Sequence, residues 1–159
     1  MACDWEKSSN KFKEINSRVI QLRISLIFSK AAGFLKYNLM SMKYGLGLII
    51  GDPNKNINWI DVNDVSRFIK KCLTNHHYIG PYNLSCDENI SQKKMIYLIK
   101  KKLYPYCIIL KIPNFLIAPI LGGRKKIINF DLKLSNEKLK KDGFKCSTNS
   151  FATLLDKLN

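Results

Sequence analysis

The sequence predicts an α/β fold with a mostly parallel sheet. Short runs of β-branched and apolar residues alternate along the chain with longer segments in which apolar residues recur at helical spacing. The first such run, residues 18–28 (RVIQLRISLIF), is largely apolar, which is the pattern of a strand covered on both faces. This alternation is typical of strands joined by crossover helices, so we expect helices packed on a parallel sheet.

Two helices are expected around that first strand. Polar residues dominate 3–16, and three apolar residues are spaced to anchor a helix there: Trp5, Phe12 and Ile15. Residues 32–44 (AGFLKYNLMSMKY) repeat apolar residues at helical spacing. The expected buried side of this second helix consists of Phe34, Leu35, Leu39 and Met42. The glycine-rich segment that follows it is expected to be a loop.

The middle of the chain predicts two strands, each followed by a capped helix. After a short strand at 57–60 (INWI), Asp61 or Asn63 is the candidate N-cap, because its side-chain oxygen can accept a free amide of the first turn. The expected apolar face of this helix is Val65, Phe68, Ile69, Cys72 and Leu73. After a strand at 81–85 (PYNLS), Ser91 is the candidate cap of a helix over 92–103. The apolar positions of that helix are Met95, Leu98, Ile99 and Leu103.

The remaining segments predict one strand and three helices. Residues 107–112 (CIILKI) form the expected strand, and Pro113 is expected to begin a helix over 114–121 that Pro119 bends or shortens. Residues 135–143 (SNEKLKKDG) predict a helix that stops at its glycine. A last helix, capped by Asn149 or Ser150, is expected to run to Leu158.

The formal net charge of +15 is the most unusual feature of the composition. Such an excess points to an acidic partner such as nucleic acid. Only four of the 27 basic residues are arginine, however, and specific nucleic-acid contacts rely on arginine. Lysine, isoleucine and asparagine are abundant together and share A/T-rich codons, so a biased genome explains the charge more simply. We therefore do not expect nucleic acid to be a partner.

Hydropathy and cysteine usage predict a cytoplasmic protein without a membrane partner. No apolar run reaches the roughly 18 residues of a membrane span. The N-terminal residues (MACDWEKSSNKFKEIN) lack the apolar core of a signal peptide. The five cysteines are scattered, odd in number and without a Cys-x-x-Cys pair. Neither a metal site nor a disulfide framework is expected from them.

Three glycines, spaced Gly45-x-Gly47-x-x-x-Gly51, raise the question of a phosphate-binding turn. A dinucleotide fingerprint needs a strand before the glycines and a helix directly after them. Here the glycines follow an expected helix and run into Asp52-Pro53, a turn signal. A surface or substrate-side loop is the better interpretation.

Tyr97 and Lys101 have the Tyr-x-x-x-Lys spacing of the catalytic pair of short-chain dehydrogenases. In such a pair the lysine lowers the pKa of the tyrosine for proton transfer. Here the two residues lie in a lysine run (KKMIYLIKKK), so a solvated helix face explains them more simply. No catalytic residue is assigned to the chain.

Two other polar pairs have structural interpretations. His76 and His77 follow a helix, where a cation at the helix end is a simpler role than a metal ligand without a third partner. Asp61 and Asp64 could be acid–base partners, but a cap is the more common role of an aspartate at a helix start.

Four segments in order resemble the C-terminal half of an extended short-chain dehydrogenase. They are residues 4–39 (DWEKSSNKFKEINSRVIQLRISLIFSKAAGFLKYNL), 45–73 (GLGLIIGDPNKNINWIDVNDVSRFIKKCL), 80–85 (GPYNLS) and 134–146 (LSNEKLKKDGFKC). More narrowly, they resemble the NAD(P)-dependent nucleoside-diphosphate-sugar epimerase-like proteins that end in a small C-terminal domain of unknown function. The resemblance implies the late strands of an incomplete Rossmann-like fold, plus a C-terminal substrate lobe.

The resemblance also implies site residues. The backbone of Ser25, Leu26 and Ile27 corresponds to the strand end beside the nicotinamide of NAD or NADP. On the substrate side it implies Lys43, Trp59 and Asp61. The family's cofactor-phosphate turn and catalytic Tyr-x-x-x-Lys correspond to nothing in the chain, so we expect the chain alone to hold no cofactor and to be inactive.

The resemblance predicts a division of the chain and a partner. Residues 1–30 would end the Rossmann-like sheet domain, and 31–159 would form the substrate-side and C-terminal domain, with 59–86 packing back on the sheet. The expected partners are a separately encoded N-terminal nucleotide-binding half and a small, sugar-nucleotide-like substrate. A basic polyanion-binding or interaction module and an inactive gene remnant are the alternatives.

Overall fold

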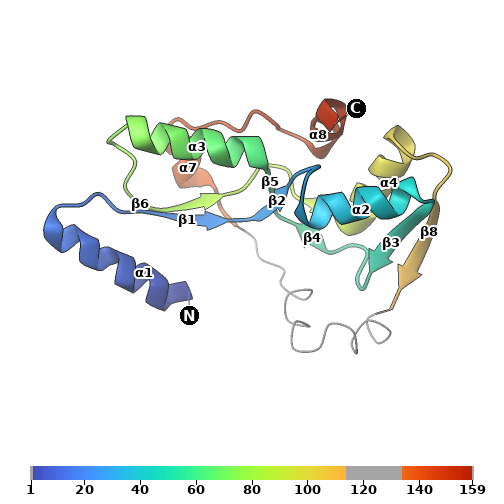
Figure 1. Cartoon of the computed structure of the whole chain (residues 1–159), viewed down its shortest axis with the longest axis horizontal. Coiled ribbons are helices and arrows are strands. Elements are labelled where there is room, and N and C mark those ends of the chain that lie inside the picture. Colours follow the sequence, from blue (N-terminus) through green and yellow to red (C-terminus); the bar gives the residue numbers. More distant parts are fainter. Residues whose placement is uncertain (1, 114–133, 159) are drawn as a thin grey trace.

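The computed structural model describes residues 2–113 and 134–158, in which helices and short strands alternate (Figure 1). The helices are α1 (Ala2–Asn10), the 3-10 helix η1 (Lys11–Ile15), α2 (Gly33–Lys43), α3 (Val62–Thr74), α4 (Gln92–Lys102), α7 (Glu137–Lys141) and α8 (Phe151–Leu158). The strands are β1 (Ile20–Ile24), β2 (Leu26–Phe28), β3 (Leu46–Ile50), β4 (Asn56–Ile57), β5 (Trp59–Asp61), β6 (Gly80–Leu84), β7 (Ile90–Ser91) and β8 (Ile108–Ile112). No helix in these ranges is long and apolar enough to cross a membrane.

The strands pair mostly in parallel, which confirms the predicted α/β class. Parallel ladders join β1 to β6, β2 to β5 and β3 to β8, and only β4 and β7 pair antiparallel. Each parallel pair is separated in sequence by at least one helix, as parallel connections require. Figure 1 shows β1 and β6 under α3 on one side of the molecule, and β3 and β8 beside α2 and α4 on the other.

The predicted strand at 18–28 is a single run that changes partner at Ser25. Its first part, β1, pairs with β6 from Ile20↔Gly80 to Ile24↔Leu84. Its second part, β2, pairs with β5, and the Leu26 amide donates to the Asn58 carbonyl at 3.2 Å. One run therefore holds both β5 and β6 in place.

Aromatic side chains fill the core in two groups. Around β2 and β5, the Trp59 ring stacks on Phe28 at 5.2 Å and meets the edge of Phe151 at 6.0 Å. Around α3, Phe68 packs against three rings at 5.0–5.3 Å: Tyr78, Tyr82 and Phe144. Both groups contain a ring from the last part of the chain, so that segment belongs to the core.

Most of the predicted caps are confirmed. Asp61 caps α3 by accepting the Asn63 amide at 3.0 Å, and Ser91 caps α4 by accepting the Lys94 amide at 3.2 Å. At the start of α8, Ser150 Oγ accepts the Thr153 amide at 3.2 Å. Gly143 follows α7 at φ 78°, a conformation that glycine adopts without strain. The helix expected over 114–121, with Pro119, lies outside the described residues.

The expected loop at Gly45–Gly51 is wrong, because this segment contains strand β3. Leu46 to Ile50 pair residue by residue with Ile108 to Ile112. Gly47 is closely packed, because a Cβ there would lie 3.2 Å from Ile96 Cγ2 and 3.4 Å from Ile109 Cγ1. The glycines thus allow α4 and β8 to approach, and only Gly45, at φ 91°, makes the turn out of α2.

The apolar anchors expected in the first helix are also wrong. Trp5, Phe12 and Ile15 are 75%, 59% and 70% exposed. Polar contacts join α1 to β1 instead: Arg23 forms a two-bond ion pair with Glu6 at 2.6 and 2.7 Å. Similarly, Ile69 and Leu73 of α3 are largely exposed, whereas Val65, Phe68 and Cys72 are buried as predicted.

The Glu6–Arg23 pair predicts an acid-sensitive attachment of α1. The hydrogen bond from Arg23 lowers the pKa of Glu6 below its ordinary value of 4.5. A lowered pKa means that the pair stabilises the fold above the pKa of unfolded glutamate and ceases to do so as pH falls through the lower folded value. A carbon-13 NMR titration should therefore give Glu6 a midpoint below that of an ordinary glutamate.

Arg23→Gln should return that midpoint to the ordinary range, whereas Lys7→Gln, which removes an exposed cation from the same helix, should leave it lowered. An unchanged midpoint in Arg23→Gln would contradict the pairing.

Candidate functional site

The partner switch at Ser25 is the candidate site, because it brings predicted cofactor and substrate residues side by side. The Ser25 amide and hydroxyl both donate to the Leu84 carbonyl, at 3.0 and 2.8 Å. One residue later, Leu26 is already in register with Trp59, and Phe28 with Asp61. In open parallel sheets, ligands bind at the carboxyl ends of strands, at the point where neighbouring strands diverge.

The cofactor-side residues are accessible at this switch. Ser25 is half-buried, and Ile24, Leu26 and Ile27 are 41%, 39% and 37% exposed. Strands of a parallel sheet are ordinarily covered on both faces, so this exposure of branched apolar side chains is unusual. Among the described residues β1 has one paired edge, with β6, and its other edge is open.

The three substrate-side residues lie in different surroundings. Trp59 is fully buried between Phe28 and Phe151, and its indole Nε1 has no hydrogen-bond partner among the described residues. Asp61 is buried at the start of α3. Lys43 is exposed at the end of α2, about 15 Å along the helix axis from the α2 start. Trp59 and Asp61 therefore adjoin the switch, and Lys43 does not.

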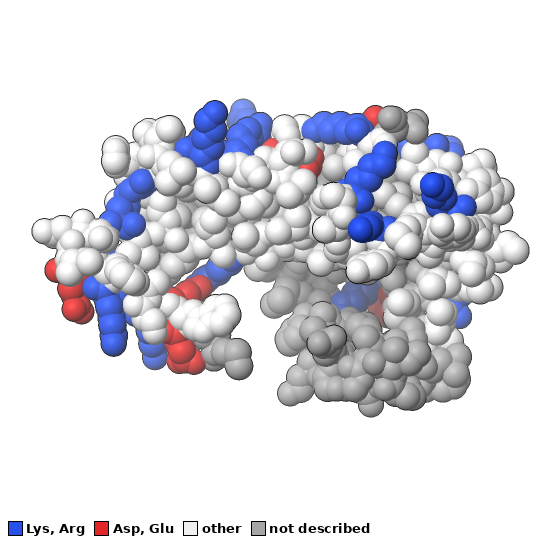
Figure 2. All heavy atoms as spheres, viewed as in Figure 1, with Lys and Arg blue, Asp and Glu red and all other residues white. Residues whose placement is uncertain are grey.

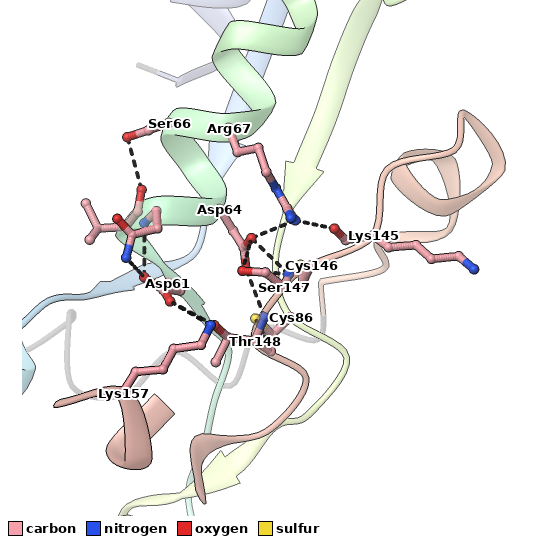
Figure 3. A network of polar contacts seen from close by, with 12 residues as sticks. Asp61, Asp64, Ser66, Arg67, Cys86, Lys145, Cys146, Ser147, Thr148 and Lys157 are labelled. Atoms are coloured by element: carbon pink, nitrogen blue, oxygen red, sulfur yellow. Dashed lines mark hydrogen bonds and ion pairs between the residues drawn. The ribbon is translucent and has the colours of Figure 1, made fainter. Parts of the chain in front are cut away.

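Asp64 is a fully buried carboxylate that joins α3 to the C-terminal segment (Figure 3). Its oxygens accept bonds from the Ser147 amide at 2.9 and 3.0 Å, the Ser147 hydroxyl at 2.8 Å and the Thr148 amide at 3.3 Å. Arg67, one turn along α3, pairs with it at 2.7 Å and donates to the Lys145 carbonyl. A buried charge of this kind is tolerated because it is fully paired.

Asp61 reaches the same segment. Thr148 Oγ1 donates to Asp61 Oδ2 at 2.8 Å, and Lys157 Nζ of α8 donates to Thr148 Oγ1 at 2.6 Å (Figure 3). Asp61 Oδ1 caps α3, while Asp61 Oδ2 and both oxygens of Asp64 bind the C-terminal segment, which leaves the acid–base interpretation without support. Sequence reasoning missed Ser147 and Thr148, because a loop serine and threonine so far along the chain from α3 carry no pattern that links them to it.

The remaining polar pairs do not form a reactive centre in the described part of the chain. Tyr97 is half exposed on α4, and with Lys101 it lines a shallow hollow of about 460 Å³ without a hydrogen bond between the two. His77 lies 3.3 Å from the Asp142 carbonyl and against the Tyr78 ring, which are contacts of a loop.

A second hollow, of about 460 Å³, lies beside β1 and β6. Its polar lining includes Arg23, Asn83, Ser135, Lys138 and Lys141. Nearby, burial and a 2.5 Å hydrogen bond to Asp142 raise the pKa of Tyr82 to about 12, so this phenol stays protonated at neutral pH.

One group of possible metal ligands occurs in the described ranges. A carboxylate oxygen of Asp64 and the sulfurs of Cys86 and Cys146 all lie within 4.8 Å of one another. No sequence pattern indicates this group, since the two cysteines lie in different loops, far apart along the chain.

The chain is similar in sequence to proteins named for epimerases. An epimerase family protein of Staphylococcus epidermidis is 26% identical over 97% of this chain, and one of Staphylococcus aureus is 24% identical over the same share. The chain spans about half the length of these curated relatives, 51% of each. No protein-family model matches it.

Solved structures agree on the fold. A human epimerase family protein solved with NADPH superposes with a TM-score of 0.78 at 17% identity, over 89% of this chain and 48% of the other. UDP-N-acetylglucosamine 4-epimerase from Bacillus cereus gives 0.73 at 12% identity, over 96% and 50%. The chain therefore has the fold of about half of each of these epimerase structures. The predicted resemblance to extended short-chain dehydrogenases is confirmed at this level.

Asp64→Asn should destabilise this epimerase-like chain strongly. The carboxamide would replace one of the two accepting oxygens with an NH2 donor and would leave Arg67 without its charged partner, at a cost of about 3 kcal/mol. Denaturant unfolding measures this loss. Asp156→Asn is the matched control, because Asp156 forms an exposed ion pair with Lys102 at 2.6 Å that contributes at most about 1 kcal/mol. Equal losses in the two variants would contradict the role of Asp64.

Proposed function

We propose that this chain supplies the substrate-side half of an NAD(P)-dependent epimerase-type oxidoreductase. The observation that carries the proposal is the open edge of β1 next to the partner switch, in a chain that matches half of each epimerase relative. A nucleotide-binding half, supplied by a separate chain, would continue the parallel sheet at that edge. It would also cover the exposed Ile24, Leu26 and Ile27 side chains.

In the assembled protein, the backbone of Ser25, Leu26 and Ile27 would lie beside the nicotinamide of NAD or NADP. The cofactor supplies the hydride chemistry, and this chain contributes the strand end that orients the ring. Its phosphates would be held by the other half. We therefore expect the chain alone to bind neither NADH nor NADPH and to show no dehydrogenase turnover.

The substrate would be a small molecule of the sugar-nucleotide class, as the name of the Bacillus cereus enzyme indicates for that protein. Asp61 and Trp59 would support the substrate side from beneath, because both are buried beside the switch. Lys43 would have to act from the end of α2, where its exposed ammonium group can reach an anionic part of the substrate.

Reconstitution tests the proposal. We expect the chain, co-expressed with the nucleotide-binding half of the Staphylococcus epidermidis relative, to form a one-to-one complex that binds NADPH. Light scattering after gel filtration measures the complex, and NADPH fluorescence measures the cofactor. Neither half alone should bind NADPH.

Ile24→Pro gives the sharpest control. The Gly80 amide donates to the Val19 carbonyl, and the Ser25 amide donates to the Leu84 carbonyl. The backbone polar groups of odd-numbered residues in this strand therefore face β6. Those of even-numbered residues face away from β6, so the Ile24 amide points to the open edge. Proline there should abolish the complex without unfolding the chain, whereas Ile24→Ala, which keeps the amide, should retain it. A complex that survives the proline would contradict pairing at this edge.

The net charge of +15 favours a second candidate, a polyanion-binding module. Figure 2 shows lysine and arginine side chains spread over the visible face rather than gathered in one stripe. This candidate predicts binding to mixed-sequence DNA whose affinity falls steeply with salt, with a log–log slope of several units. A shallow slope, or weak binding at low salt, would rule out the polyanion-binding candidate and leave only the epimerase proposal.

A further inference from the structure

The fold brings together two cysteines that the proposed function does not use. Cys86 lies in the loop between β6 and β7, and Cys146 lies in the segment between α7 and α8. Their sulfurs are within 4.8 Å of each other, beside Asp64, and Figure 3 shows both thiols on the tail side of α3. Cys86 also donates to the Thr148 carbonyl at 3.3 Å, so its orientation is fixed by the same segment that carries Cys146.

The two thiols are chemically unequal. The neighbouring Cys146 sulfur raises the pKa of Cys86, and burial raises it further. Interaction with Cys86 lowers the pKa of Cys146, and this effect outweighs burial and the Asp64 and Asp87 charges, which act in the opposite direction. Cys146 is half-buried, whereas Cys86 is buried. A more acidic, reachable thiol next to a protonated, buried one is the arrangement of an attacking and a resolving cysteine.

A metal ion is a poorer occupant of this position. Asp64, the third possible ligand, already accepts bonds from Ser147 and Thr148 and is paired with Arg67 at 2.7 Å. A cation would have to displace the guanidinium and at least one amide bond. A bond between the two sulfurs requires neither change.

We propose that Cys86 and Cys146 form a reversible disulfide. The oxidant is a small-molecule disulfide such as glutathione disulfide. The Cys146 thiolate attacks one sulfur of the oxidant, which forms a mixed disulfide and releases one thiolate. Cys86 then attacks the Cys146 sulfur, and the second glutathione leaves, taking the proton of Cys86. The protein dithiol is oxidised and one disulfide is reduced to two thiols, so atoms and electrons balance.

The bond would fasten the C-terminal segment covalently where Asp61 and Asp64 hold it by hydrogen bonds. It would close the long loop of chain between positions 86 and 146. Such a cross-link restricts the unfolded chain, so oxidation should raise Tm by about 10 °C.

The full chain, equilibrated in a glutathione redox buffer and quenched with acid, tests the proposal. We expect a mass loss of about 2 Da, consistent with one disulfide, and a non-reduced peptide map that joins residue 86 to residue 146, with both reversed by excess reduced glutathione. Cys72→Ser, which removes another buried thiol, should leave this product unchanged. Cys86→Ser should stop at the mixed disulfide on Cys146, and Cys146→Ser should give neither product.

A denatured control keeps the test decisive if a variant folds poorly. In concentrated urea the native preference for the 86–146 pair should disappear, because it depends on the fold. A native chain that yields only mixed disulfides, or pairs joining other cysteines, would overturn the proposal. So would thiols that resist oxidation while bound to added Zn²⁺.

Discussion

The buried charge of Asp64 is the constraint on which the described part of the molecule most depends. A carboxylate with no exposed surface must be given partners, and here they come from Arg67 one turn away and from the backbone of a segment far along the chain, at Ser147 and Thr148. The C-terminal segment therefore cannot leave α3 without breaking the bonds that Ser147 and Thr148 donate to this carboxylate. Because Phe144 and Phe151 flank that segment, the same contact positions rings in both aromatic groups of the core.

The partner switch at Ser25 depends on this arrangement. β5 is only three residues long and leads directly into α3, so its position is set by the Asp61 cap and the Trp59 packing rather than by a long ladder. With β5 held, the strand that leaves β6 at Ser25 has a second partner to join. The result is a divergence of parallel strands next to an edge that is unpaired among the described residues, which is where ligands bind in open parallel sheets.

Sequence patterns predicted most local structure because the signals were local. A short polar side chain before an apolar repeat identified the starts of α3 and α4, and Gly143 identified the end of α7. The glycines at 45–51 were misassigned because strand β3 is stabilised by β8, a distant segment of the chain, and Gly47 packs closely against Ile96. Likewise, the spacing of Trp5, Phe12 and Ile15 is helical, but nothing in the sequence shows that polar contacts hold that helix.

The candidate site residues come only from resemblance, and the polar contacts that join Asp61 to the C-terminal segment had no signal in the sequence. Thr148 connects Asp61 to Cys86. Its hydroxyl donates to Asp61, next to Trp59, and its carbonyl accepts a hydrogen bond from the Cys86 thiol. A covalent bond at Cys86 would therefore act on the same residue that bonds to Asp61 beside the switch. A disulfide at Cys86 that moved Thr148 would therefore also move the hydrogen-bond partner of Asp61, because one residue makes both contacts.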